Sequence, residues 1–184
     1  MPTRPASHSV VMDSRDIDRA VRQVARAIAS STKSVAEVVL VGIQTGGVWF
    51  ARHLAGHLER EWGVPVPVGQ LDISMHRDDL DRRLAPPVHP TSIGCDVTGK
   101  TVILADDVLF SGRTIRAAMD ALTDLGRPER IQLAVLIDRG HRELPIEANF
   151  VGKRLPTGAA DRVDVQLADT LAASQVVLEK AARP

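Results

Sequence analysis

The chain has 184 residues, of which 44% are hydrophobic and 25% charged, and its formal net charge is zero. This length suits one domain with a sizeable core, and this composition is typical of globular proteins. A neutral chain has no global basic field, so any binding of nucleic acid must depend on a local patch. No apolar run reaches the length of a membrane span, and the first residues lack the apolar core of a signal peptide. We therefore expect a cytoplasmic protein that does not associate with a membrane.

Residues 1–12 are predicted to be a loose N-terminal arm with a short strand at residues 9–12, and a helix follows that Asp13 or Ser14 can cap. Its buried face is marked by apolar residues at helical spacing: Ile17, Val21, Val24 and Ile28. Four arginines stand two positions earlier each time, about 200° around the helix, and so line the opposite face: Arg15, Arg19, Arg22 and Arg26. This face is either an ordinary solvated surface or a stripe that binds the RNA backbone, and Asp16 and Asp18 dilute its charge.

A buried strand is predicted over residues 37–41, followed by a glycine-containing loop over residues 42–47 and a second helix. Glycine lets backbone N–H groups approach an anion closely, so this loop is a candidate phosphate-binding site. By itself the signal is weak, because such loops are common in α/β proteins.

Residues 65–73 predict a strand that is entered through prolines, and the next strand begins only at Thr101. Long connections in compact domains are often lids or binding loops. We therefore predict a flexible flap over residues 74–98, and the alternative is a solvated hairpin without chemistry.

The strongest motif lies at residues 101–114. A β-rich run over residues 101–104 leads to the adjacent carboxylates of Asp106 and Asp107, which stand where the strand is expected to end, and small and polar residues then open a helix. A helix start offers unpaired N–H groups and the positive end of the helix dipole, where a phosphate binds well. The carboxylates can accept hydrogen bonds from sugar hydroxyls or help to hold Mg²⁺. A phosphorylated sugar would satisfy both halves of the motif, and the alternative is a polar turn without a ligand.

Residues 131–137 are nearly all apolar, as expected of a central parallel strand. The polar residues 138–145 come at the carboxyl end of this strand, so we expect them to face the same crevice as the acid pair. Short strands are predicted over residues 149–152 and 162–167, and residues 169–184 are predicted to be a tail with a frayed helix.

Residues 105–114 resemble the binding motif for 5-phosphoribosyl-1-pyrophosphate (PRPP) in type I phosphoribosyltransferases. Together with residues 72–80 and 132–145, and with Gly152-Lys153 and Pro156-Thr157, they make about residues 9–168 similar to the PyrR family. This family comprises bifunctional pyrimidine operon regulators with uracil phosphoribosyltransferase activity. The resemblance implies an α/β fold of the type I phosphoribosyltransferase class, in which helices flank a central parallel sheet and a small hood and a flexible flap cover the site. We expect residues 1–184 to form one such domain.

The same resemblance implies the reaction of uracil with PRPP to UMP and pyrophosphate, with Mg²⁺ as cofactor. It also implies that the protein binds the leader messenger RNA of pyrimidine operons when UMP is bound, and that it forms a homodimer or a higher homo-oligomer. Site residues carry over in the same way. The expected catalytic residues are Asp106, Asp107 and Arg77, and Asp106 and Asp107 hold Mg²⁺ directly or through ribose and water. The base is expected near Arg139 and Val163. The residues expected around PRPP or the nucleotide are Thr45, Gly46, Gly47, Asp78, Asp106, Asp107, Val108, Leu109, Phe110, Ser111, Gly112, Arg113 and Thr114.

Two positions depart from the family pattern. The pyrophosphate loop commonly reads Thr-Arg-Gly, whereas this chain has Gly46 in the second position, and Phe110 replaces the usual tyrosine. Loss of a cation beside the leaving pyrophosphate is expected to lower the rate about a hundredfold or more. We therefore expect weak transfer, and we expect Gly46→Arg to raise turnover. The sequence thus predicts a pyrimidine-nucleotide-sensing, RNA-binding regulator with weak uracil phosphoribosyltransferase activity, and the alternative is a purely metabolic enzyme for uracil or another base.

Overall fold

A five-stranded parallel sheet forms the centre of the part of the chain that the structure describes. This structure is a computed structural model, and it describes residues 7–76, 90–168 and 170–182. The strands lie in the order β3-β2-β4-β5-β6, with the bounds β2 (Val38–Ile43), β3 (Val68–Leu71), β4 (Thr101–Leu109), β5 (Arg130–Asp138) and β6 (Phe150–Arg154). All six residues of β2 are buried. This burial explains the continuous apolar runs in the sequence, since parallel strands covered on both faces have no polar side.

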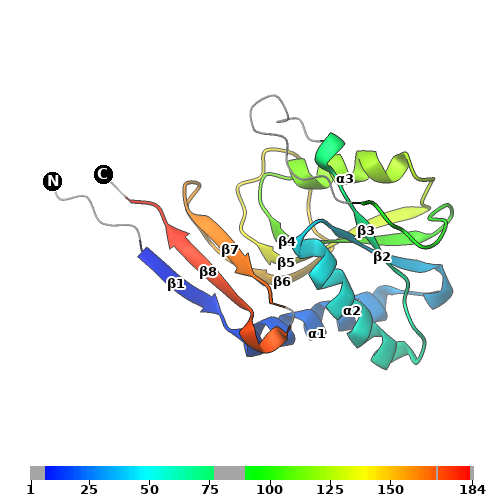
Figure 1. Cartoon of the computed structure of the whole chain (residues 1–184), viewed down its shortest axis with the longest axis horizontal. Coiled ribbons are helices and arrows are strands. Elements are labelled where there is room, and N and C mark those ends of the chain that lie inside the picture. Colours follow the sequence, from blue (N-terminus) through cyan, green and yellow to red (C-terminus); the bar gives the residue numbers. More distant parts are fainter. Residues whose placement is uncertain (1–6, 77–89, 169, 183–184) are drawn as a thin grey trace.

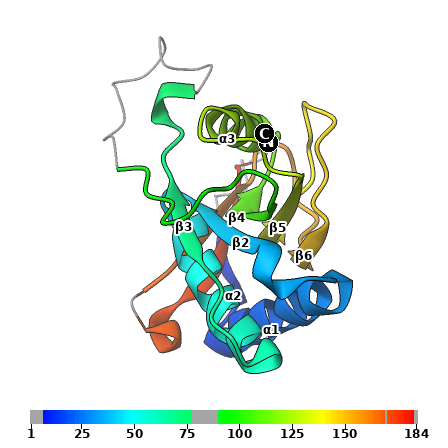
Figure 2. The same ribbon diagram turned by 90° about the vertical axis from the view of Figure 1, so that its right-hand side faces the viewer.

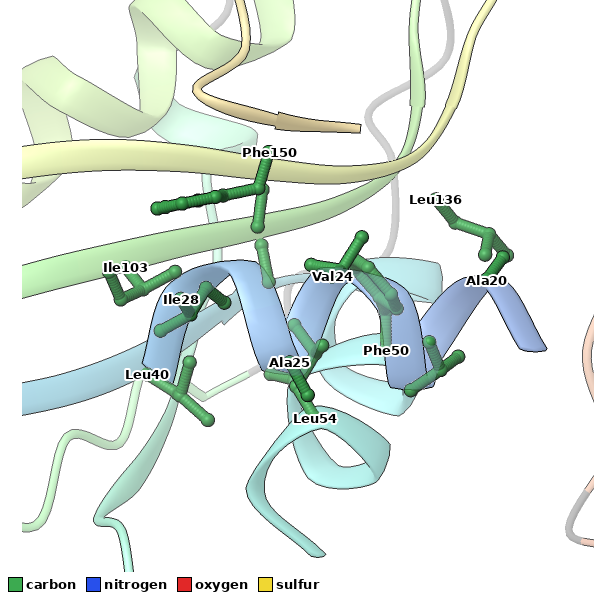
Figure 3. Close-up of a cluster of buried hydrophobic side chains, with 14 of the residues drawn as sticks. Ala20, Val24, Ala25, Ile28, Leu40, Phe50, Leu54, Ile103, Leu136 and Phe150 are labelled. Atoms are coloured by element: carbon green, nitrogen blue, oxygen red, sulfur yellow. The ribbon is translucent and has the colours of Figure 1, made fainter. Parts of the chain in front are cut away.

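Three helices cover the two faces of this sheet in the described ranges (Figures 1 and 2). Helices α1 (Ser14–Ser31) and α2 (Gly46–Trp62) pack against one face, and α3 (Arg113–Thr123) packs against the other. Figure 3 shows Val24 and Ile28 of α1 in the first of the two cores, together with Phe50 of α2 and Phe150 of β6. The predicted buried face of the first helix is therefore confirmed. The Asp13 side chain caps this helix by accepting from the backbone N–H of Asp16 at 2.9 Å.

A second, antiparallel sheet has the order β1-β8-β7 and lies to one side of the central sheet (Figure 1). Its strands are β1 (Ser7–Met12), β7 (Arg162–Gln166) and β8 (Gln175–Lys180), and β1 pairs with β8. The short strand predicted at residues 9–12 is thus confirmed, and it begins earlier, at Ser7, where a loose arm was predicted. The prediction of a helical tail is wrong, because residues 175–180 form β8. Nothing local in the sequence reveals a pairing between the two ends of the chain. This small sheet is the hood. The segment between β7 and β8 is tied to the central domain, because the indole N–H of Trp49 in α2 donates to the carbonyl of Ala168 at 2.9 Å.

The predicted flap is only partly described. Residues 74–76 form a short 3₁₀ helix, η2 (Ser74–His76), whereas Arg77 and Asp78 lie outside the described residues. The later part of the predicted flap is packed: Ser92 and Gln70 exchange two backbone hydrogen bonds of 2.9 Å, and Val97 is buried in the second core. The flap therefore does not extend to residue 98, because the chain rejoins the edge of β3 before β4 begins. The remaining short helices are η1 (Val35–Glu37) and η4 (Leu171–Ala173). Of the helices that the structure describes, none is both long and apolar enough to cross a membrane.

Candidate active site at the carboxyl edge of the sheet

Strands β2, β4, β5 and β6 all run in the same direction, so the loops that follow them meet at one edge of the central sheet. This is the edge at which open α/β sheets bind ligands. The loop after β2 continues directly into α2, and the loop after β4 continues into α3. Two helix starts therefore flank the sequence-predicted acid pair.

The acid pair lies inside β4 and not after it, because this strand continues to Leu109. Asp106 pairs in the ladder with Val135 of β5, and Val108 pairs with Ile137. The prediction that the strand ends at the carboxylates is thus wrong. An acidic pair interrupts the apolar run, and the sequence pattern does not show that the backbone ladder continues through it. The consequence is that the rigid central sheet positions both carboxylates, with Asp106 buried and Asp107 half-buried.

Both carboxylates are poorly solvated. Burial raises the pKa of Asp106 well above its usual range, and the charge of the adjacent Asp107 raises it further. Burial also raises the pKa of Asp107, and Asp164 of β7 adds to this increase. The hydrogen bond between the two side chains offsets this effect at Asp107, and local backbone groups add to the offset: Asp107 N–H donates to Asp106 Oδ1 at 3.0 Å and Val108 N–H donates to Asp107 Oδ1 at 2.9 Å. Binding of a cation or of hydroxyl donors would therefore stabilise the two carboxylates.

Magnesium fits these two carboxylates in its usual manner. Within the described ranges no cluster of three or more histidine, cysteine or acidic side chains could hold a metal ion by itself. Magnesium, however, is typically bound by one or two carboxylates and completes its coordination with substrate oxygens and water. Asp106 and Asp107 could hold it in this way together with a phosphorylated sugar.

The predicted phosphate cradle, residues 108–114, comes directly after the acid pair in the chain. Gly112 has φ +92°, a conformation that favours glycine, and it precedes the first residue of α3. No side chain of the described residues caps this helix start; the N–H of Arg113 makes a long bond of 3.4 Å to the hydroxyl of Ser111. The start of α3 is therefore available to an anion.

The loop with Thr45, Gly46 and Gly47 reaches the acid pair directly. Helix α2 already begins at Gly46, and the side chain of Thr45 makes no capping bond in the described structure. A Cβ atom added at Gly46 would overlap the carboxyl of Asp107, and one added at Gly47 would overlap the carbonyl oxygen of Ala105. Gly47 is thus required by its close approach to the backbone of β4, whereas a side chain at position 46 would displace the side chain of Asp107. A cavity of about 360 Å³ opens beside this loop, and its lining includes Thr45 and Arg52.

Of the two predicted base-binding residues, Arg139 lies against Phe110 and Val163 lies in the hood. Arg139 is buried and holds its guanidinium 4.2 Å from the centre of the Phe110 ring. It also donates from Nη2 to the carbonyl of Gly158 at 3.0 Å, so much of its hydrogen-bonding capacity is used within the protein. Val163 is half-buried in β7, at the hood. The ring of Phe110 is over one-third exposed and is a flat surface next to the cradle.

The arginine stripe of α1 is exposed, on one of the two helices that pack against the same face of the sheet. Three of its members form ion pairs: Arg19 with Asp16 at 3.0 Å, Arg22 with Asp18, and Arg26 with Glu61 at 3.6 Å. Only Arg15 has no ion-pair partner among the described residues. The local positive charge is thus smaller than the number of arginines suggests.

Sequence reasoning missed Arg142. It belongs to a polar run that was expected to face the crevice, but no role followed from its spacing. In the structure its guanidinium donates to the carbonyl of Phe110 at 2.9 Å and to Asp138 at 2.7 Å. The only sequence signal for a role of Arg142 is its position in the polar run that directly follows a central strand.

Comparisons with known proteins agree with this geometry. The family described as "Phosphoribosyl transferase domain" matches residues 12–170. The "Bifunctional protein PyrR" of Chloroflexus aurantiacus is 52% identical over 169 residues, which cover 91% of this chain and 93% of the relative. The protein of the same name from a Roseiflexus species is 56% identical over 158 residues, with 85% and 86% coverage.

Solved structures show the same fold at low identity. A hypoxanthine-guanine phosphoribosyltransferase from Bacillus anthracis superposes with a TM-score of 0.63 at 19% identity, covering 86% of each chain. A hypoxanthine phosphoribosyltransferase from Trypanosoma cruzi superposes with a TM-score of 0.66 at 18% identity, covering 92% of this chain and 95% of the other. These likenesses concern the fold alone.

Proposed function

The chain belongs to the phosphoribosyltransferase family and, within it, to the PyrR proteins, and from this we propose that it makes UMP from uracil and PRPP and regulates pyrimidine genes through RNA. The observation that carries the proposal is the poorly solvated acid pair, held by β4 between the helix starts of α2 and α3. Two helix starts and one acid pair match the 5′-phosphate, the pyrophosphate and the ribose of PRPP.

The proposed reaction is a displacement at the anomeric carbon of PRPP. Uracil N1 forms the new bond to this carbon, the bond to the pyrophosphate oxygen breaks, and the proton of N1 leaves the base. The transition state resembles a cation, and the charges of Asp106 and Asp107 favour that distribution. The N–H groups at the start of α3 hold the 5′-phosphate, and those at the start of α2 hold the leaving pyrophosphate. Magnesium, when bound, would neutralise pyrophosphate charge.

Labelled uracil, hypoxanthine and guanine, each incubated with PRPP and Mg²⁺, test the activity and its base. We expect UMP as the main product. Formation of IMP or GMP instead would support the alternative, a metabolic enzyme for another base.

The protein is further proposed to be a single cytoplasmic domain that forms a homodimer or a higher homo-oligomer. Arg77 and Asp78 are proposed to close on PRPP, and Arg139 and Val163 are proposed to lie beside the base.

Transfer is proposed to be weak because the loop at Thr45 to Gly47 carries no cation. The structure changes what we expect of Gly46→Arg. A Cβ at position 46 would lie 2.9 Å from the Cβ of Asp107, which no rotamer change can move. We therefore expect Gly46→Arg to displace the acid pair and to lower kcat by at least about tenfold, since small misplacements of catalytic groups are costly. Gly46→Ala separates size from charge: a loss in both variants supports the steric cause, whereas a higher kcat in the arginine variant would show that the missing cation limits the rate.

Binding of pyrimidine leader RNA is proposed to use the arginine stripe of α1. Filter binding with and without UMP, across a salt series, should show tighter binding with UMP and weaker binding as salt rises. When all four arginines of the stripe are replaced by glutamine, the slope of the logarithm of the binding constant against the logarithm of the salt concentration should become shallower. The expected change is about 0.7 for each lost phosphate contact, the value for single strands. Arg116→Gln in α3, an exposed arginine on the opposite face of the sheet, is the control. An unchanged slope in the quadruple variant would place the RNA elsewhere.

A further inference from the structure

The loop over residues 139–146, which we name the bracing loop, lies directly against the phosphate cradle. Its backbone donates to two carbonyls beyond the acid pair that are separated by one residue: Arg139 N–H donates to Leu109 O at 3.1 Å, and Glu143 N–H donates to Ser111 O at 3.0 Å. A Cβ added at Gly112 would lie 3.3 Å from Cβ of Ile146, so the two loops are also packed together. The shape of the cradle therefore depends on a second loop from the neighbouring strand.

The side chain of Arg142 binds the carbonyl that the backbone of the bracing loop does not bind. Its Nη1 donates to Phe110 O at 2.9 Å, the carbonyl between the two that the backbone of the bracing loop binds. Its Nε donates to Ile146 O at 2.9 Å, and its Nη2 donates to Asp138 Oδ1 at 2.7 Å. Only 21% of the side chain is exposed. The planar guanidinium thus joins the cradle, the end of β5 and the far side of the bracing loop, which a lysine could not do.

Peptide geometry links these contacts to phosphate binding. In a planar trans peptide the carbonyl of one residue and the N–H of the next point in opposite directions. Because the carbonyls of Leu109, Phe110 and Ser111 all point to the bracing loop, the next three N–H groups point away from it. Within the described residues, the N–H groups of Ser111 and Gly112 donate to no protein atom. They are thus oriented and left available for an anion, as in other backbone anion sites.

We propose that Arg142 is a positioning residue of the phosphate cradle, which holds the Phe110 carbonyl so that the N–H of Ser111 faces the 5′-phosphate. Arg142 does not touch the ligand in this proposal. The proposal rests on the proposed function in one respect, namely that a 5′-phosphate occupies the cradle. It does not depend on which base is bound or on whether RNA is bound.

Calorimetry with UMP and with uridine tests this role, because the two ligands differ only in the phosphate. In Arg142→Met we expect the Kd of UMP to rise about tenfold or more, the scale of one hydrogen bond to a charged group, while the Kd of uridine changes less than twofold. Arg142→Lys keeps the charge and is expected to show the same split. It also carries the test if the methionine variant does not fold. Arg116→Met, which removes an exposed arginine that pairs with Asp120 in α3, should leave both Kd values unchanged.

The outcomes separate the two proposals. Equal changes in the Kd of UMP and uridine, or an unchanged Kd of UMP in both Arg142 variants, would overturn the positioning role. GMP and guanosine are measured in parallel. A wild-type protein that prefers GMP would refute the proposed pyrimidine base, yet the ratio of GMP to guanosine would still test Arg142. A wild-type protein that binds none of these ligands would overturn both proposals.

Discussion

Asp106→Asn is expected to reduce uracil transfer by at least about 100-fold, the scale of removing one preorganised electrostatic group, and to raise the melting temperature at neutral pH. The two effects have one cause. The Asp106 carboxylate is buried beside Asp107 and accepts a hydrogen bond from the backbone N–H of Asp107, so its charge is costly in the folded state without ligand. Asparagine keeps the acceptor oxygen but not the charge. Relief of about 1 kcal/mol would raise the melting temperature of a chain this size by about 2–4 °C.

The pH dependence follows from the direction of the pKa shift. Because the pKa of Asp106 is raised in the folded state, the folded protein keeps a proton that the unfolded chain releases above the ordinary carboxyl pKa of 3.8. Stability therefore falls as pH rises from that value through the raised pKa. The variant lacks this titration, so its advantage over wild type should be smallest near pH 4 and largest at neutral and alkaline pH.

Thermal melts from pH 4 to pH 8, without ligand, measure this difference. Asp120→Asn removes an exposed carboxylate of α3 and should change neither activity nor the pH profile. A variant that melts below wild type at pH 8, or one that retains full transfer, would contradict the assignment of Asp106 as a buried functional charge. Such a gain in stability on loss of function is expected where an active site holds groups that its fold alone does not satisfy.

Gly47→Ala is expected to lower kcat/KM for PRPP by at least about 100-fold. The added Cβ would overlap the carbonyl oxygen of Ala105, with Ala105 C and Asp106 Cα both 3.1 Å away. These are backbone atoms of the central strand β4, which cannot move aside as a side chain can. The start of α2 must therefore shift away from the acid pair, and displacements of about 1 Å in a catalytic site can cost a hundredfold.

Gly56→Ala is the matched control in the same helix. A Cβ at this position meets nothing within 4 Å, and alanine is the better helix former by about 0.5–1 kcal/mol. We expect unchanged kinetics and a slightly higher melting temperature. Equal activity in the Gly47 and Gly56 variants, measured by transfer of labelled uracil at several PRPP concentrations, would show that the loop does not need its close contact with β4.

Much of the fold could be predicted because its signals are local. The repeat of Ile17, Val21, Val24 and Ile28 reports a buried helical face, and a continuous apolar run such as β5 reports a strand covered on both sides. The order of strand, acid pair, small residues and helix start likewise indicates a phosphate and sugar site without reference to the rest of the chain. These patterns report which side chains are buried, but they do not report their partners.

Only the tertiary structure decided which distant segments meet. The pairing of β1 with β8 joins the two ends of the chain, and strand propensity carries no information about such a partner. The overlap of position 46 with Asp107 reversed the expected effect of an arginine there, because a glycine in a sequence does not show what lies against it. The role of Arg142 depends on the direction of backbone carbonyls, which no side-chain pattern encodes. The sequence by itself therefore determined which residues and which chemistry to expect at the candidate site. The positions of those residues were decided only by the tertiary structure, because they depend on how one backbone segment packs against another.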